Sequence, residues 1–312
     1  MTTHEVEHQV TVQAPAAEAY RIVAEVERWP LVFPPTVHAE RTATGEHTER
    51  IHLWATANGT AKDWTSLRTL DPEALTVGFR QEVPAAPVAS MGGTWIVEPL
   101  DAESCRVRLL HDYRALGDDP EALRWIDEAV DRNSRTELDS LKAWAERGPA
   151  EVAATFAFED TVRIAGAAKD VYDFLDQARL WDERLPHVRR VNLTEDTPGL
   201  QILEMDTVAK DGSEHTTKSV RVCLPHQRIL YKQTTLPALL LLHIGSWEIA
   251  EDGDDVLATA RHEVTLKTRA VPTVLGEGAG PEEGREFVHS ALSANSRATL
   301  ALAKEFAEAR RG

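Results

Sequence analysis

Lys62-Asp63-Trp64-Thr65-Ser66-Leu67-Arg68 is the stretch on which the interpretation of this chain depends. It follows the turn signal Asn58-Gly59 and is rich in β-branched and aromatic residues, which predicts a β-strand. Side chains on a strand alternate between two faces, so Trp64, Ser66 and Arg68 share one face. An indole, a hydroxyl and a guanidinium in a row suit the wall of a cavity that holds a flat, oxygen-rich and largely apolar molecule.

The Ser-x-Arg pair occurs a second time, as Ser219 and Arg221, in a strand-like run from Thr216 to Leu224. Alternating Ser and Arg is also typical of a solvent-exposed strand face. Because Leu67 lies on the opposite face, periodicity alone leaves both orientations open. The occurrence of the pair at matching places in two halves of one chain favours the inward orientation.

The composition is that of a globular protein with two domains. The chain has 312 residues, of which 42% are hydrophobic and 27% charged, so each half can bury a core. The formal net charge of −17 argues against binding to nucleic acid or to anionic membrane surfaces, since both would repel the chain.

Other whole-chain features predict a cytoplasmic protein. The longest apolar run, Leu236 to Ile244, is too short to cross a bilayer, and the polar first eight residues show no secretory signal. The two cysteines, Cys105 and Cys223, form no metal-ligand spacing and fit buried free thiols in a reducing compartment. No Gly-rich phosphate loop or clustered His/Cys motif is visible, so we expect neither a metal nor another cofactor.

Both halves show the same predicted order of elements: a strand, a helix, a series of closely spaced strands and a long C-terminal helix. Closely spaced strands with no helices between them indicate an antiparallel meander. In the first half these elements are predicted at Glu5–Gln13, from Pro15, at Thr36–Tyr113 and from Pro120 to about Arg147. In the second half they are predicted at Phe156–Ile164, Ala167–Gln177, His187–Lys267 and, after a loop at Val271–Gly284, Arg285–Arg310.

Landmarks recur at nearly constant spacing, which indicates duplication of a whole domain. The paired landmarks are Trp29 and Trp181, Asn58-Gly59 and Asp211-Gly212, Arg68 and Arg221, Trp95 and Trp247, His111 and His262, and Asn133-Ser134-Arg135 and Asn295-Ser296-Arg297. We therefore predict domains at 1–149 and 150–312, with a linker at Gly148–Ala154. A curved sheet with a long helix across its open side leaves a gap that becomes a ligand pocket, and Trp29, Trp54, Trp64 and Trp95 suit such a wall.

The order of elements and these residues resemble the di-domain aromatase/cyclases of bacterial type II polyketide synthases. The resemblance rests on Glu27-Arg28-Trp29-Pro30, Trp64-Thr65-Ser66-Leu67-Arg68, Trp95 and Asn133-Ser134-Arg135, and it covers the chain once per half. It implies an α+β fold of two tandem helix-grip (START/Bet v1-like) domains, each a curved seven-stranded antiparallel sheet wrapped on a long C-terminal helix.

The resemblance also implies roles for individual residues. Ser66 and Arg68, and their counterparts Ser219 and Arg221, would project into the pockets as catalytic residues. The implied substrate-binding residues are Trp29, Trp64, Trp95, Thr36, Trp181, Trp247, Asn133 and Asn295. Two positions depart from the family pattern: Thr217 stands where the first half has Trp64, and Thr36 stands where the family has a tyrosine.

The implied substrate is a poly-β-ketone carried by an acyl carrier protein, with other synthase components as further partners. The reaction would be an intramolecular aldol cyclisation followed by loss of water and aromatisation, without a cofactor. Positioning a reactive chain contributes roughly 7–11 kcal/mol in favourable cases. A guanidinium in a dry pocket would stabilise the developing enolate oxygen, and a serine would orient a ketone or a water.

Several alternatives stay open at this point. The same cavity could belong to a non-catalytic carrier or sensor of a lipid, isoprenoid or aromatic compound. His111 and His262 fit either an acid–base role or a structural hydrogen bond, and Asn133 and Asn295 fit either ligand binding or helix packing. The higher tryptophan content of the first half favours that half as the one that turns over substrate.

Overall fold

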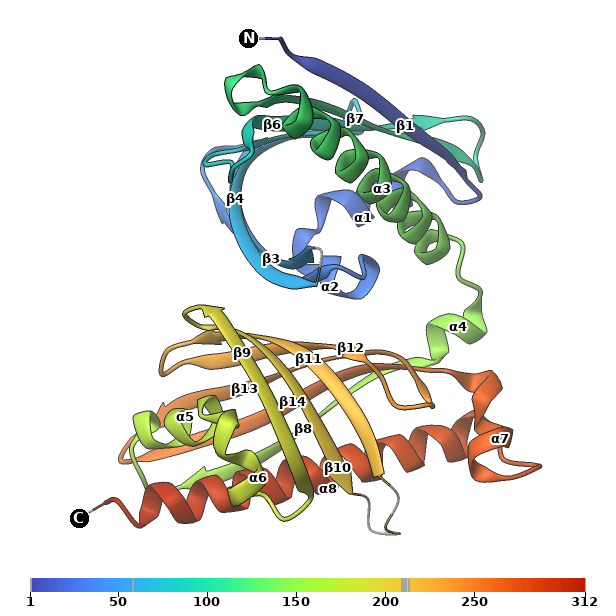
Figure 1. Cartoon of the computed structure of the whole chain (residues 1–312). Coiled ribbons are helices and arrows are strands. Elements are labelled where there is room, and N and C mark those ends of the chain that lie inside the picture. The colour runs from blue at the N-terminus through green and yellow to red at the C-terminus, as the bar shows by residue number, and fades with distance from the viewer. Residues whose placement is uncertain (1, 58, 209–211, 213, 312) are drawn as a thin grey trace. The chain divides into compact units, whose positions relative to one another are not determined.

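The computed structural model describes residues 2–57, 59–208, 212 and 214–311, and it divides into two compact units. One unit consists mostly of residues up to Gly148, and the other mostly of residues from Pro149. Both have the predicted helix-grip architecture, a seven-stranded antiparallel sheet with a long helix across it (Figure 1).

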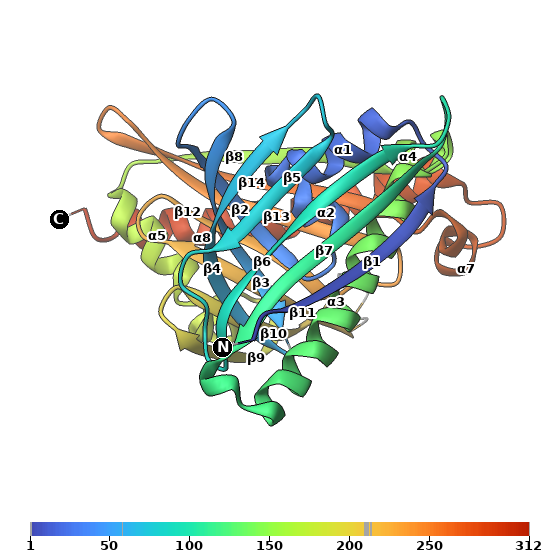
Figure 2. The same ribbon diagram turned by 90° about the horizontal axis from the view of Figure 1, so that it is seen from above.

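The first sheet consists of β1 and a six-stranded meander. Its strands are β1 (His4–Val12), β2 (Thr36–Ala43), β3 (Thr48–Ala57), β4 (Thr60–Asp71), β5 (Thr76–Gln81), β6 (Val88–Pro99) and β7 (Cys105–Ala115). They lie in the order β1-β7-β6-β5-β4-β3-β2, and Figure 2 shows β1, β7, β6 and β5 side by side. The N-terminal strand therefore pairs with the last strand of the meander, from His4 opposite Tyr113 to Val12 opposite Cys105.

Three α-helices accompany the first sheet. They are α1 (Ala16–Ala24), α2 (Trp29–Val32) and the long α3 (Pro120–Ala145). Helix α1 follows Pro15, whose missing N–H costs nothing at a helix start. Helix α3 begins with Pro120 after Asp119, whose carboxylate accepts a hydrogen bond from the Glu121 N–H at 3.0 Å. Its buried residues, Ile126, Val130, Ser134, Leu138 and Leu141, recur at helical spacing and face the sheet.

The second unit repeats this order. The expected linker Gly148–Ala154 contains a short helix, α4 (Pro149–Ala153). After it come β8 (Thr155–Ile164), α5 (Ala168–Asp176), α6 (Trp181–Arg184), β9 (Val188–Thr197), β10 (Leu200–Val208), β11 (Glu214–Leu224), β12 (Arg228–Thr235), β13 (Leu240–Asp252), β14 (Asp255–Leu266), α7 (Val271–Leu275) and α8 (Pro281–Glu308). The sheet order β8-β14-β13-β12-β11-β10-β9 matches that of the first sheet element by element.

The segment Val271–Gly284 also differs from its prediction. It was expected to be a loop, but it contains α7 and the first turn of α8. Pro272 and Pro281 each lie in the first turn of their helix, where proline is tolerated. The Gly and Pro content that suggested a loop therefore marks two helix starts.

The predicted turns fall partly outside the described residues. Asn58 and Asp211 are not described, but Gly59 and Gly212 have φ values of 79° and 83°. These values lie in the left-handed region that favours glycine, which is why a glycine stands at each hairpin. Among the described residues, no helix is long and apolar enough to cross a membrane, and no group of three or more His, Cys, Asp or Glu side chains could hold a metal ion.

Candidate active site

The inner face of β4 carries Trp64, Ser66 and Arg68. Burial alternates along the strand: Ser66 and Arg68 are buried, and Leu67 is 44% exposed. Trp64 lies on the same face and packs with Trp29 against the cluster Val26, Ala39, Ile51 and Leu53. The strand therefore turns its polar residues inward and an apolar residue outward, which is the less common of the two orientations.

Arg68 is 2% exposed and binds groups of its own domain. Its guanidinium donates to the carbonyl oxygens of Val23 (2.8 Å) and Ala24 (3.4 Å) at the C-terminal end of α1, and it lies over the Trp29 ring. The buried carboxylate of Glu49 lies 3.1 Å from its Nη1. Burial lowers the pKa of Arg68 to about 10 against the opposing effect of Glu49, so the group is charged at neutral pH.

Arg221 makes the equivalent contacts in the second domain, with one difference. Its guanidinium donates to the carbonyl oxygen of Leu175 at the end of α5 (2.6 Å) and lies over the Trp181 ring. The position equivalent to Glu49 is Gln201, whose amide oxygen accepts a 2.8 Å hydrogen bond from Arg221. Arg68 therefore has a carboxylate in direct contact, whereas the side chain directly bonded to Arg221 is neutral.

Arg221 lines a cavity of about 120 Å³ between the sheet and α8. This is several times the space that a buried water needs, so side chains do not fill the hollow. The cavity wall includes Trp181, Trp247, Thr217, Ser219, Asn295 and Thr299. Thr217 occupies the position at which the first domain has Trp64, and the smaller side chain leaves space open.

Three further polar groups meet in this cavity wall, all of them missed by sequence reasoning or left open by it. The Tyr231 hydroxyl lies 3.1 Å from Nδ1 of His262 and 3.4 Å from Nε2 of His243, and these two nitrogens lie 3.0 Å apart. Nε2 of His262 lies 2.7 Å from the Ser296 hydroxyl on α8. A hydroxyl and two imidazoles within hydrogen-bond distance of one another can exchange protons.

Burial sets the protonation state of these groups. It lowers the pKa of His262 to about 4, and it lowers that of His243 to about 3, with a smaller contribution from the nearby His262. Burial also raises the pKa of Tyr231 well above its usual range. At neutral pH the cavity therefore holds two neutral imidazoles and a protonated phenol.

The strand registers identify the equivalent positions of the first domain. Phe79 lies opposite Arg68 and Gly93, just as Tyr231 lies opposite Arg221 and Gly245. His111 lies opposite Gly93, as His262 does opposite Gly245. Two residues before these glycines stand Met91 and His243, so the first domain has Phe and Met where the second has Tyr and His.

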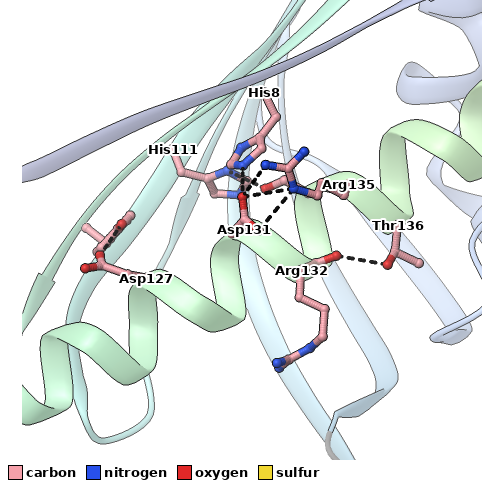
Figure 3. A network of polar contacts seen from close by, with 9 residues as sticks. His8, His111, Asp127, Asp131, Arg132, Arg135 and Thr136 are labelled. Carbon is pink, nitrogen blue, oxygen red and sulfur yellow. Dashed lines mark hydrogen bonds and ion pairs between the residues drawn. The ribbon is translucent and has the colours of Figure 1, made fainter.

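His111 nevertheless belongs to a polar network in the first domain (Figure 3). Its Nδ1 lies 3.4 Å from the Ser134 hydroxyl, and burial lowers its pKa to about 4. Beside it, Nε2 of His8 lies 2.9 Å from the carboxylate of Asp131, which also accepts hydrogen bonds from Arg135 (Figure 3). The histidine–serine contact therefore occurs in both domains.

A carboxyl group on α3 is a further residue that sequence reasoning missed. Glu137 lies 3 residues after Ser134, as the cavity-lining Thr299 lies 3 residues after Ser296. Burial raises the pKa of Glu137 to about 7. The group at this position of the first domain therefore exchanges protons near neutral pH, which a threonine cannot do.

The remaining predicted residues lie in varied surroundings. Trp29, Trp95 and Trp181 pack in the cores, and the indole N–H groups of Trp29 and Trp181 donate to carbonyl oxygens of α1 and α5. Thr36 is buried at the start of β2, and Asn133 is exposed on α3. The substrate-binding roles of these residues stay predictions.

Trp54 was wrongly expected to line a pocket. On β3 the side chains of Glu49, Ile51 and Leu53 face the core, so Trp54 lies on the outer face. There its ring stacks on His52 and His38, with centroid distances of 3.7 and 5.2 Å.

A helix-grip domain with a cavity lined by an arginine, a tyrosine and two histidines is typical of the proteins that bind a small molecule between sheet and helix. Comparison with known proteins agrees. Residues 3–146 match the family model for polyketide cyclase/dehydrase and lipid transport. The granaticin polyketide synthase bifunctional cyclase/dehydratase of Streptomyces virginiae is 54% identical over 96% of this chain and 99% of its own length. The actinorhodin counterpart of Streptomyces coelicolor is 45% identical over 95% of both chains.

Two solved structures superpose on the whole chain. The di-domain aromatase/cyclase BexL of the BE-7585A pathway has a TM-score of 0.89 at 59% identity and covers 98% of this chain and 99% of its own. StfQ of the steffimycin pathway has a TM-score of 0.86 at 38% identity with the same coverage. The chain therefore belongs to the family of bifunctional polyketide cyclase/dehydratases, and the predicted tandem helix-grip fold is confirmed.

Proposed function

We propose that this protein is a polyketide aromatase/cyclase that folds a poly-β-ketone, closes a ring by intramolecular aldol addition and removes water to aromatise it. The observation that carries the proposal is the second-domain cavity, in which a buried guanidinium and a hydrogen-bonded group of one tyrosine and two histidines line the same space. Aldol addition and loss of water move only protons and water, so the reaction needs no redox or group-transfer cofactor.

Each of the cavity residues would have a separate role in this reaction. Arg221 would hold the ketone or enolate oxygen that becomes negatively charged, because a guanidinium offers several donors in a fixed geometry and the side chain directly bonded to it is neutral. Ser219, which lies two residues before Arg221 and therefore on the same strand face, would orient a neighbouring ketone or a water. The tryptophans supply apolar walls for a chain that becomes flat and aromatic.

The first domain provides the same elements in a different electrostatic setting. Arg68 is held by Glu49, so its charge is already balanced before any substrate binds. We propose that Ser66 and Arg68 help to fold the polyketide substrate in this domain, with Trp29, Trp64 and Trp95 as its apolar contacts. Asn133 and Asn295 remain candidates for hydrogen bonds to substrate oxygens.

Other synthase components are the expected partners, with an acyl carrier protein delivering the substrate as a thioester, in the cytoplasm. The chain's relatives support this assignment, because they are named as parts of polyketide synthases. The alternative of a non-catalytic carrier is not favoured by these relatives. A non-catalytic carrier would also have no use for the hydrogen-bonded tyrosine and histidines of the cavity.

The test is reconstitution with a purified minimal synthase that builds a poly-β-ketone on its carrier protein, with and without the full chain. The wild-type protein should shift products from spontaneously cyclised shunts to one ring pattern, and Arg221→Ala should restore the shunts. Arg221→Ala is the cleaner variant, since removing Arg68 would take away the closer of the two arginines paired with the buried Glu49 carboxylate and leave only Arg41, at 3.6 Å. Unchanged product profiles for Arg68→Ala, Arg221→Ala and the double variant, each with an unaltered melting temperature, would rule the proposal out.

A further inference from the structure

We propose that Tyr231, His262 and His243 form the dehydrating group of the second domain, in which Tyr231 protonates the leaving hydroxyl and His262 accepts the proton from carbon. The inference rests on the proposed function and adds to it the residues and the domain that carry out water loss. Its substrate class is a cyclic β-hydroxy ketone, the immediate product of aldol ring closure.

The hydrogen-bonding pattern fixes which nitrogen carries each proton. Among the described residues, the buried Nδ1 of His243 has no hydrogen-bond partner, so we place the proton of this ring on Nε2, where it can be donated. His243 then donates from Nε2 to Nδ1 of His262 at 3.0 Å, and His262 donates from its own Nε2 to Ser296 at 2.7 Å. This arrangement leaves the Tyr231 O–H free to turn from His262 toward a ligand in the cavity.

The step balances without any external reactant. The Cα–H bond of the substrate breaks and its proton goes to Nδ1 of His262, while the electron pair forms the new C=C bond. The C–O bond breaks, and the hydroxyl leaves as water with the proton of Tyr231. The proton on His262 then returns to the Tyr231 oxygen across 3.1 Å, and both groups regain their starting states.

His243 has a defined part in this sequence. Its Nε2–H lies 3.0 Å from Nδ1 of His262 and 3.4 Å from the Tyr231 oxygen. When Tyr231 gives up its proton, the phenolate becomes the stronger acceptor and attracts this N–H. The switch frees the lone pair of His262 at the moment when that nitrogen must accept a proton.

The protonation states favour these roles at neutral pH. Burial lowers the pKa of His262 to about 4, so the ring is a neutral base, and it keeps Tyr231 protonated as an acid. The neighbouring Arg221 has a neutral side-chain partner, so it can stabilise negative charge on the ketone oxygen while the α-proton leaves.

The backbone on the adjacent strand fixes the position of Tyr231. A Cβ added at Gly245 would lie 2.5 Å from the Tyr231 hydroxyl oxygen and 2.5 Å from the Arg261 carbonyl oxygen. The tyrosine therefore lies against bare backbone, and any larger residue at 245 would displace it. In the first domain, Phe79 lies against Gly93 in the same way but has no hydroxyl to offer.

The experiment compares Tyr231→Phe in the full chain with Tyr172→Phe, a change at a buried tyrosine of α5 in the same domain. Both are assayed with the minimal synthase, and mass spectrometry measures the rate of dehydrated products and the amount of cyclic products that retain the water. Tyr231→Phe introduces the residue that the first domain already accommodates at this place. It should lower the rate of dehydration about 100-fold and accumulate the hydrated ring, whereas Tyr172→Phe should not.

The possible results separate this proposal from the function on which it rests. If wild-type protein leaves the products of the synthase unchanged, the proposed function fails. If wild-type protein aromatises the chain and Tyr231→Phe stays within about twofold of it, the dehydrating group is refuted while the function stands. His243→Met, which copies the first domain, is the second variant, and it keeps the test decisive if Tyr231→Phe does not fold. Full dehydration activity in the variants that fold would overturn the proposal.

Discussion

Glu49→Ala is the change that tests the electrostatic difference between the two domains. Glu49 and Arg68 are a buried ion pair, with exposed fractions of 5% and 2%. The alanine would leave a buried guanidinium that still donates to Val23 and Ala24 but has lost the carboxylate in contact with it. Breaking a buried pair in this way costs about 3–5 kcal/mol.

Gln201→Ala is the matched control in the second domain. It removes the 2.8 Å hydrogen bond from Arg221 to a neutral amide, together with the longer bonds that the amide donates to Asp176 (3.3 Å) and Glu195 (3.2 Å), and a hydrogen bond to a charged group contributes about 1.5–3 kcal/mol. Both variants delete a buried polar partner of an arginine, but only one deletes a charge. Glu49→Ala should therefore be the more destabilising of the two.

Urea unfolding followed by tryptophan fluorescence gives the measurement. Six of the eight tryptophans lie before residue 150 and two after it, so the two transitions differ in amplitude and can be fitted separately. Glu49→Ala should move the transition with the larger amplitude to lower urea. A loss smaller than that of Gln201→Ala, or below about 1 kcal/mol, would refute the view that Glu49 balances a buried charge.

Three other predictions follow from groups already described. His262 has a pKa of about 4 in the folded chain and a higher one when unfolded, so the unfolded state binds more protons between those values. The free energy of unfolding should therefore fall by about 3 kcal/mol as the pH falls from 7 to 4. Thermal unfolding of His262→Gln should show no such loss. Gly245→Ala should lower both the melting temperature and the dehydration rate, because its Cβ meets the Arg261 carbonyl oxygen at 2.5 Å; an unchanged rate would contradict this. Glu137 has a folded pKa raised to about 7, so its contribution to stability falls as the pH rises from the unfolded value toward 7. Glu137→Gln should stabilise the chain above pH 7 and not at pH 4, as denaturant titration can check.

Much of the fold could be predicted because its signals are local. Turn residues, alternating strands and the spacing of paired landmarks indicated two copies of one domain, and the Ser-x-Arg strands turn inward in both. Trp54 could also have been placed correctly, because Glu49, Ile51 and Leu53 alternate with it along β3.

The composition of the site was harder to predict because it depends on contacts between distant strands. Gln201 contacts Arg221 from 20 residues away, and Tyr231 meets His262 from 31 residues away. The signal that could have found Tyr231 and His243 lies in the comparison of the halves. Once register is known, Tyr231 and His243 are among the positions at which one copy has a polar residue and the other an apolar one.

The guanidinium that anchors the C-terminal end of α1 or α5 has a consequence for interpreting duplicated enzymes. Because Arg68 and Arg221 each donate hydrogen bonds to carbonyl oxygens at the end of a helix, a copy that had become a pseudoenzyme would still use its arginine to pack that helix against the sheet. The presence of this residue in a half therefore does not identify that half as active. Side chains that line the cavity and that folding does not require are the better guide to which copy is still catalytically active.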